Sequence, residues 1–172
     1  MYFETIKQLQ KMLRNFSAML DKASQYAESR SFNSANYLTA RLAPDMFPFA
    51  RQVQSICDGA KYGAARLAGK EAPRHEDNEQ TLAELQTRLK SVIEYIDTYK
   101  AEDFAGAAER RIVLPWMKGQ HILGQDYLME FMNPNFYFHL SMAYALLRQA
   151  GVAVGKLDYL GNLNIKQDTP AS

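Results

Sequence analysis

The stretch FMNPNFYFHLSMAYALLRQAG, residues 131–151, decides the fold prediction, because it reads as a long helix that is apolar on almost every side. The helix is expected to begin earlier, near Gln125, and to end at Gly151, since glycine commonly follows a helix C-terminus. The pattern favours a kinked but continuous helix through Pro134. The alternative is a fresh start, with Asn133 as the N-cap and Pro134 at the first helical position.

A helical wheel at about 100° per residue separates this helix into two sides. One side, expected to point into the core, carries Leu128, Met132, Asn135, His139, Met142 and Leu146. The other side is the only polar edge and carries Tyr137, Ser141, Tyr144 and Arg148. Since a surface helix of a monomer usually has a broader polar face, we expect a second cover from a loop, the C-terminal tail or another subunit. The preferred prediction is a homodimer through the outer face of this helix.

Three further stripes of apolar residues, spaced three or four apart, predict three more helices over residues 3–27, 48–68 and 81–99. The last of these is expected to open with a capping box between Thr81 and Glu84. Four long helices, each with an apolar stripe, are typical of an antiparallel four-helix bundle, so the predicted fold class is all-α.

The segments between these helices complete the predicted domain. Residues 29–48 read as a long loop, which in a compact domain often binds a ligand or covers a partner. Residues 70–80 read as a polar linker, and residues 110–125 as a short β-hairpin or extended crossover between helices three and four. We expect a single domain over residues 1–164 and a frayed polar tail over 165–172.

Composition excludes several classes of partner. The chain has 20 basic and 19 acidic residues, a net charge of +1, so it presents no electrostatic footprint for nucleic acid or an anionic membrane surface. No apolar run approaches the ~18 residues of a membrane span, and the N-terminus lacks the pattern of a signal peptide. The single cysteine, Cys57, excludes an internal disulfide and fits a reducing compartment. We therefore expect a soluble cytoplasmic protein.

His139 is the most informative polar residue of the apolar helix. It could be a metal ligand or an acid–base group, or a core histidine whose ring nitrogens are satisfied by neighbouring polar groups. Spacing favours the core histidine, because metal sites need several convergent ligands. His75, in the polar linker, is predicted to be solvated, and His121, in the hairpin, is predicted to be exposed.

Other candidate groups carry weaker signals. Cys57 lies on an apolar helix face and is expected to pack rather than to react. Asp126 and Glu130 could be an acid–base pair, although acids at the start of a helix are more often solvated. Trp116 is predicted to plug the hairpin against the bundle, with a pocket wall as the alternative.

From Pro134 to Gly161 the chain reads PNFYFHLSMAYALLRQAGVAVGKLDYLG. This segment resembles the hallmark PNFxFHxxxAYxxLRxxGVxxGKxDYLG of an uncharacterised family of bacterial and fungal proteins in the DinB/YfiT-like superfamily of metalloenzymes. The segments APDMFPFARQVQ and DNEQTLAELQTRL are also similar, so the resemblance covers essentially the whole chain. It implies a DinB-like four-helix bundle.

The wider superfamily typically binds a divalent metal through three histidines, one on helix two and an H-x-x-x-H pair on helix four. Alignment on the Leu-Arg-x-x-Gly segment places His139 at the second histidine of that pair and Asn135 at the first. Helix two offers Gln52 and Gln54 instead of a histidine. Only His139 matches a ligand position, and amide oxygens are poor ligands for zinc, nickel or iron. No metal or other cofactor is therefore predicted, with a divalent metal at a non-standard site as the alternative.

Two functions remain open at this point. The first is a small-molecule-binding or oligomeric scaffold protein without the metal site, with a candidate pocket formed by His139, Asn135, Gln52 and Tyr144. The second is a metal-dependent thiol S-transferase or hydrolase, as the resemblance implies for other members of the superfamily. No catalytic residue is assigned.

Overall fold

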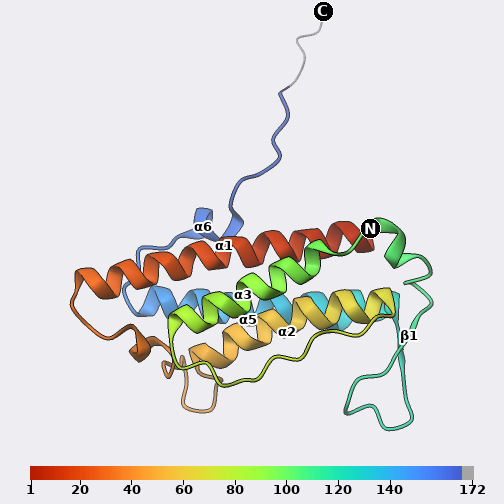
Figure 1. Ribbon diagram of the computed structural model, residues 1–172, viewed down its shortest axis with the longest axis horizontal. Helices are drawn as coiled ribbons and strands as arrows, with labels where there is room; N and C mark the ends of the chain where they lie inside the picture. Colours follow the sequence, from red (N-terminus) through yellow and green to blue (C-terminus); the bar gives the residue numbers. More distant parts are fainter. Residues whose placement is uncertain (168–172) are drawn as a thin grey trace, which may run out of the picture.

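The computed structural model describes residues 1–167, and its four longest helices lie side by side (Figure 1). These helices are α1 (Tyr2–Ser29), α2 (Phe49–Ala68), α3 (Leu82–Asp97) and α5 (Asn133–Gln149). Each contains one of the apolar stripes found in the sequence, so the prediction of four helical segments in a mainly helical chain is confirmed.

The shorter elements connect and cover these helices. They are η1 (Ser34–Tyr37), η2 (Ala101–Phe104), β1 (Arg111–Ile112), β2 (Ile122–Leu123), α4 (Gly124–Asp126), η3 (Tyr127–Met132) and α6 (Lys156–Leu160). Strands β1 and β2 pair antiparallel, with Arg111 opposite Leu123, and form the base of the predicted hairpin. The hairpin therefore lies between α3 and α5, as expected.

The core forms where the apolar faces of the four long helices meet. Fully buried side chains include Leu9, Leu13, Phe16 and Leu20 of α1, Val53, Ile56 and Ala60 of α2, Leu85, Leu89 and Val92 of α3, and Phe136, Leu140 and Ala143 of α5. Removing such side chains from water contributes roughly 1.5–3 kcal/mol for each large aliphatic or aromatic residue. The capping box that starts α3 is present, since Glu84 N donates to Thr81 Oγ1 at 3.2 Å and Thr81 N donates to Glu84 Oε2 at 3.0 Å.

The direction of α3 differs from the predicted antiparallel arrangement. In Figure 1, α1 runs against α2, but α2 and α3 run in the same direction. Residues 70–81, which we call the strap, return along the length of the molecule between the two helices. At up to about 3.3 Å per residue the strap is long enough to span a 20-residue helix of about 30 Å. The antiparallel prediction is therefore wrong for this pair, because the strap is a long crossover rather than a tight turn.

The apolar helix is continuous from Gly124 to Gln149, through α4, η3 and α5. Its six-residue middle segment, η3, is π-helical. Met132 and Asn133 both have right-handed helical dihedrals, with φ of −60° and −64°, so the chain does not restart at Asn133. The continuous helix is confirmed, and the fresh start is wrong. A widened turn directly before Pro134 gives its ring room that a regular α-helical turn would not.

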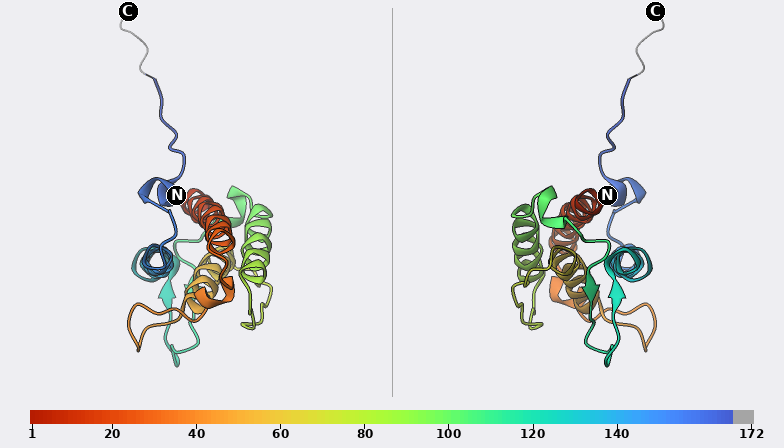
Figure 2. Two further views of the ribbon diagram at one scale, coloured as in Figure 1. Left: turned by 90° about the vertical axis from the view of Figure 1, so that its left-hand side faces the viewer. Right: turned by 90° about the vertical axis from the view of Figure 1, so that its right-hand side faces the viewer.

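Part of the second cover of this helix is supplied by the chain itself. Helix α6 lies beside α1 and α5 (Figure 2), and the Tyr159 hydroxyl lies 3.2 Å from Ser141 Oγ. The Tyr159 ring also packs edge-on against Tyr144. An ion pair between Lys22 and Asp158, at 2.6 Å, holds α6 to α1. Ser141 and Tyr144 of the predicted polar edge are therefore in contact with the C-terminal segment, whereas Arg148 of that edge is exposed.

Two further predictions concern the C-terminal tail and the lack of a membrane-spanning helix. Residues 165–167 of the predicted tail are exposed and have no regular structure, and residues 168–172 lie outside the described part of the chain. Among residues 1–167, no helix combines the length and apolar character that crossing a bilayer requires.

Candidate functional site

A cavity of about 440 Å³ opens between α2 and the helix formed by η3 and α5. Helix α2 contributes one face to it, made of Arg51, Ser55, Asp58, Gly59, Tyr62 and Arg66. The opposite wall is made of Tyr127, Phe131, Met132, Asn135 and His139. Phe47, from the loop before α2, and Trp116, from the β-hairpin, complete the lining. These two loops project from the same side of the molecule (Figure 2).

His139 lies in this cavity wall in a defined tautomer. Its Nδ1–H donates to Gln52 Oε1 at 2.7 Å, and Gln52 Nε2 donates to the Phe47 carbonyl oxygen at 3.2 Å. The Phe47 ring stacks on the imidazole, with an interplanar angle of 7°. Burial and then the charge of Arg51 lower the pKa of His139 below its ordinary value. The imidazole is therefore neutral near pH 7, and Nε2 is the ring nitrogen left to accept a hydrogen bond from a ligand.

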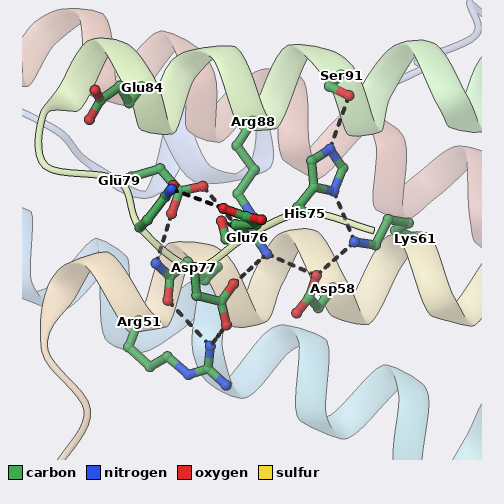
Figure 3. Close-up of polar contacts among 12 residues, drawn as sticks. Arg51, Asp58, Lys61, His75, Glu76, Asp77, Glu79, Glu84, Arg88 and Ser91 are labelled. Carbon is green, nitrogen blue, oxygen red and sulfur yellow. Dashed lines mark hydrogen bonds and ion pairs between the residues drawn. The ribbon is translucent and has the colours of Figure 1, made fainter. Parts of the chain in front are cut away.

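Beside the cavity, an ion network centred on a buried arginine ties the strap to α2 and α3 (Figure 3). Arg88 of α3 is 3% exposed. Its guanidinium lies 3.0 Å from Asp58, 3.0 Å from Asp77 and 2.9 Å from Glu79. Burial alone would raise the pKa of Glu79, but hydrogen bonds from Arg88 and Gln54 outweigh it, and the pKa is lowered. One arginine thus neutralises acids from two segments.

A second part of the network holds a fully buried lysine (Figure 3). Lys61 Nζ lies 3.0 Å from Asp58 and 2.9 Å from His75 Nδ1. Because an ammonium group only donates, His75 Nδ1 accepts, and its Nε2–H donates to Ser91 Oγ at 3.1 Å. The prediction that His75 is solvated is therefore wrong. The residue lies in a polar segment, but that segment packs between α2 and α3.

The His75 contact predicts a loss of stability in mild acid. Burial, then the charges of Lys61 and Arg88, lower the pKa of His75 below its ordinary value of 6.5. The stabilisation from neutral His75 is therefore complete above about pH 6.5 and is lost as the pH falls through the lower folded-state value. In urea unfolding, the parent should lose more free energy of unfolding between pH 7 and pH 5 than His75→Gln. Glutamine keeps a donor and an acceptor but does not titrate, and His139 titrates in both proteins. Equal losses would contradict the prediction.

Residues 1–160 match the family described as a domain of unknown function, DUF1993. The chain belongs to the DUF1993 family. The DUF1993 chain is also similar to a crystal structure of a DinB family member from Shewanella denitrificans, with 44% sequence identity and a TM-score of 0.93. That similarity covers 97% of this chain and 95% of the other. The resemblance inferred from the C-terminal segment is thus confirmed. A comparison with curated proteins found no match.

The four residues predicted to form a pocket take different places in the DUF1993 chain. His139 and Asn135 line the cavity. Gln52 is 2% exposed and lies behind the imidazole, where it orients the ring. Tyr144 lies away from the cavity, against Tyr159 of α6. The structure therefore brings His139, Asn135 and Gln52 together, and leaves Tyr144 apart from them.

The remaining candidates are placed as follows. Trp116 lines the cavity and is 60% exposed. It therefore forms a pocket wall, the alternative prediction, and is not a buried plug of the hairpin. His121 is exposed, as predicted, and so are Asp126 and Glu130. Cys57 is fully buried, and burial raises the pKa of its thiol to about 12, which leaves it a packing residue.

The donors around His139 do not fit the transition metal that the superfamily implies. The imidazole has one nitrogen bound to Gln52, and its cavity neighbour Asn135 offers a neutral amide. Within residues 1–167 there is no group of three His, Cys, Asp or Glu side chains that could hold a metal ion. One imidazole nitrogen and an amide oxygen are too few and too weak for zinc, nickel or iron.

The sequence pattern does not single out the charged residues of this region. Arg51, Asp58 and Arg66 lie on the polar side of α2, where charges are usually solvated, although with Tyr62 their spacing places them on one helix face. Arg88 lies three residues after Leu85 and four before Val92, at the flank of an apolar stripe, and this spacing indicates a buried charge. Its partners in the strap are distant in sequence, and no local pattern indicates them.

Proposed function

We propose that this DUF1993 chain is a binding protein for an organic small molecule, which occupies the cavity beside His139 without a metal. The observation that carries the proposal is the cavity itself, whose volume of about 440 Å³ lies within the range of small-molecule sites, about 300–1,000 Å³. Its aromatic walls, with polar groups such as Asn135 and His139 between them, are typical of such sites. The four long helices would act as a four-helix bundle, in which ligand sites lie between facing helices.

The polar groups of the cavity suit hydrogen bonding better than catalysis. Neutral His139 can accept through Nε2, and Asn135 can both donate and accept. A metal-dependent thiol S-transferase or hydrolase would need at least two further strong ligands, which the donor set lacks. The binding function is therefore favoured over the enzymatic one.

A cavity-filling variant tests the proposal. The chain has one tryptophan, Trp116, in the cavity wall, so its fluorescence reports on occupancy. A library of small organic molecules is expected to contain compounds that shift both the Trp116 emission and the melting temperature of the parent. Ser55→Phe should abolish both shifts, and Ser55→Ala, without added bulk, should keep them. If the same compounds act equally on Ser55→Phe, the ligand lies elsewhere and the proposal fails.

We also propose that a second copy of the chain covers the outer face of the helix 124–149. The proposal is supported by Phe138, a large apolar side chain of this helix that is 52% exposed and lies one turn after the exposed Pro134. A net charge of +1 adds little repulsion between copies, and a symmetric dimer would pair the same patch with itself.

The dimer is tested by its mass in solution. Light scattering at micromolar concentration is expected to give about twice the 19.6 kDa of one chain. Phe138→Glu should give single chains, because a buried unpaired charge costs several kcal/mol. Leu157→Glu, at a 79% exposed position on α6, should leave the mass unchanged. A parent mass of one chain would rule out this dimer.

A further inference from the structure

The charged groups of the cavity differ in whether they have a partner. Arg51 is paired with Asp77 of the strap, and Asp58 is paired with Lys61 and Arg88. Arg66 is different, because within residues 1–167 no carboxylate lies at ion-pair distance from it. The cavity wall therefore carries one uncompensated positive charge, at Arg66.

The guanidinium of Arg66 is held in place by aromatic neighbours. Its central carbon lies 5.2 Å from the centre of the Tyr62 ring and 5.9 Å from that of the Tyr127 ring. Its Nη1 donates to the Tyr127 hydroxyl at 3.2 Å. These contacts use one of five N–H donors, so a fork of donors remains for a planar oxyanion. A guanidinium that is already ordered loses little entropy when it binds such a group.

The same end of the cavity offers flat apolar surface. The Trp116 and Phe131 rings lie 5.3 Å apart, and Phe131 stacks with Tyr127 at 5.8 Å. An aromatic ring of a ligand can pack against such surfaces, because aromatic pairs gain stability beyond that of their buried area. A cationic ligand is disfavoured, because Arg66 lies among these rings and the nearest cavity acid, Asp58, is already neutralised.

We propose that the ligand is an aromatic carboxylic acid, whose carboxylate pairs with Arg66 and whose ring packs against Trp116 and Phe131. This inference rests on the proposed function, since it names the class of molecule that the cavity binds. Hydrogen bonds to charged groups contribute about 1.5–3 kcal/mol, so the acid should bind at least about 10-fold more tightly than its neutral amide.

Two probes of equal shape test this inference. Biphenyl-4-carboxylate and biphenyl-4-carboxamide differ only in charge and in one non-hydrogen atom of the head group with its hydrogens. Their affinities can be measured by calorimetry and Trp116 fluorescence. The parent is expected to bind the acid at least about 10-fold more tightly. Arg66→Gln should reduce this ratio to near one, and Arg66→Lys should leave an intermediate ratio because it keeps the charge but not the fork. Arg74→Gln, which removes the same charge at an exposed strap position, should keep the parent ratio.

Three other results would contradict the inference, and one of them would also contradict the proposed function. If acid and amide bind the parent equally, the cavity binds small molecules but not through Arg66, so this inference fails and the proposed function stands. If Arg66→Gln melts like the parent and still prefers the acid, the inference fails as well. If neither probe binds the parent and the library screen also finds no ligand, the inference and the proposed function both fail.

Discussion

Replacement of Arg88 by methionine is expected to lower the free energy of unfolding by about 3 kcal/mol. Methionine is similar in length and apolar, so packing is largely kept, but three carboxylates lose their shared cation. Asp58 retains Lys61 and Asp77 retains Arg51, whereas Glu79, whose side chain is 9% exposed, keeps the Gln54 amide but loses its cation. Removing one partner of a buried ion pair leaves an uncompensated charge, which costs far more than the pair contributes.

Urea unfolding at pH 7 measures this effect, and two further variants show its cause. Glu79→Gln in the Arg88→Met background removes the stranded charge and should recover at least about 1 kcal/mol. Lys90→Met changes an exposed lysine of the same helix, 3.9 Å from Glu94, and should cost no more than about 0.5 kcal/mol. A loss below about 1 kcal/mol in Arg88→Met would mean that the strap acids do not depend on this arginine.

The second large effect is expected at Gly124, where the hairpin enters α4. A Cβ atom at Gly124 would lie 1.9 Å from the Ala107 carbonyl oxygen, which is backbone and cannot rotate away. Gly124→Ala must therefore displace the start of the helix that carries Tyr127 and Phe131. We expect a loss of about 3 kcal/mol, at the upper end for overpacking, and a melting temperature lower by roughly 6–12 °C.

Gly155→Ala is the matched control for this glycine. Its added Cβ would meet nothing closer than Asp158 Oδ2 at 4.0 Å, and Gly155 has an extended φ of −137° that alanine adopts. The change should stay within about 0.5 kcal/mol. If calorimetry shows similar melting temperatures for the two variants, the close approach of Gly124 to Ala107 does not constrain the fold.

The helices were predictable because their signals are local. The apolar stripe from Phe3 to Ala27 and the capping box at Thr81 each depend on residues within one or two turns. The direction of α3 was not predictable in this way, because it depends on where the strap packs. The strap reads as a solvated linker, and its contacts with residues distant in sequence, such as Lys61 and Arg88, explain its path.

The candidate site was predictable only in part, for the same reason. His139 and Asn135 share one side of a helix, so a wheel places them together, and the resemblance implies a site between this helix and helix two, which carries Gln52. The wheel could not show that Gln52 points at His139 Nδ1, or that Tyr144 turns toward α6. Arg66 escaped notice because a lone arginine on a polar helix face usually means only solvation.

The π-helical segment η3 sets the rotational phase of everything that follows it. In a regular α-helix, residues four apart drift by about 40° per step, so a set spaced by fours soon spirals off one surface. Tyr127, Phe131, Asn135 and His139 are such a set, yet all of them line one cavity. A π-turn advances less per residue, so the unwinding before Pro134 offsets that drift. Deleting one residue of η3 would thus turn the aromatic pair away from His139 and divide one binding surface into two.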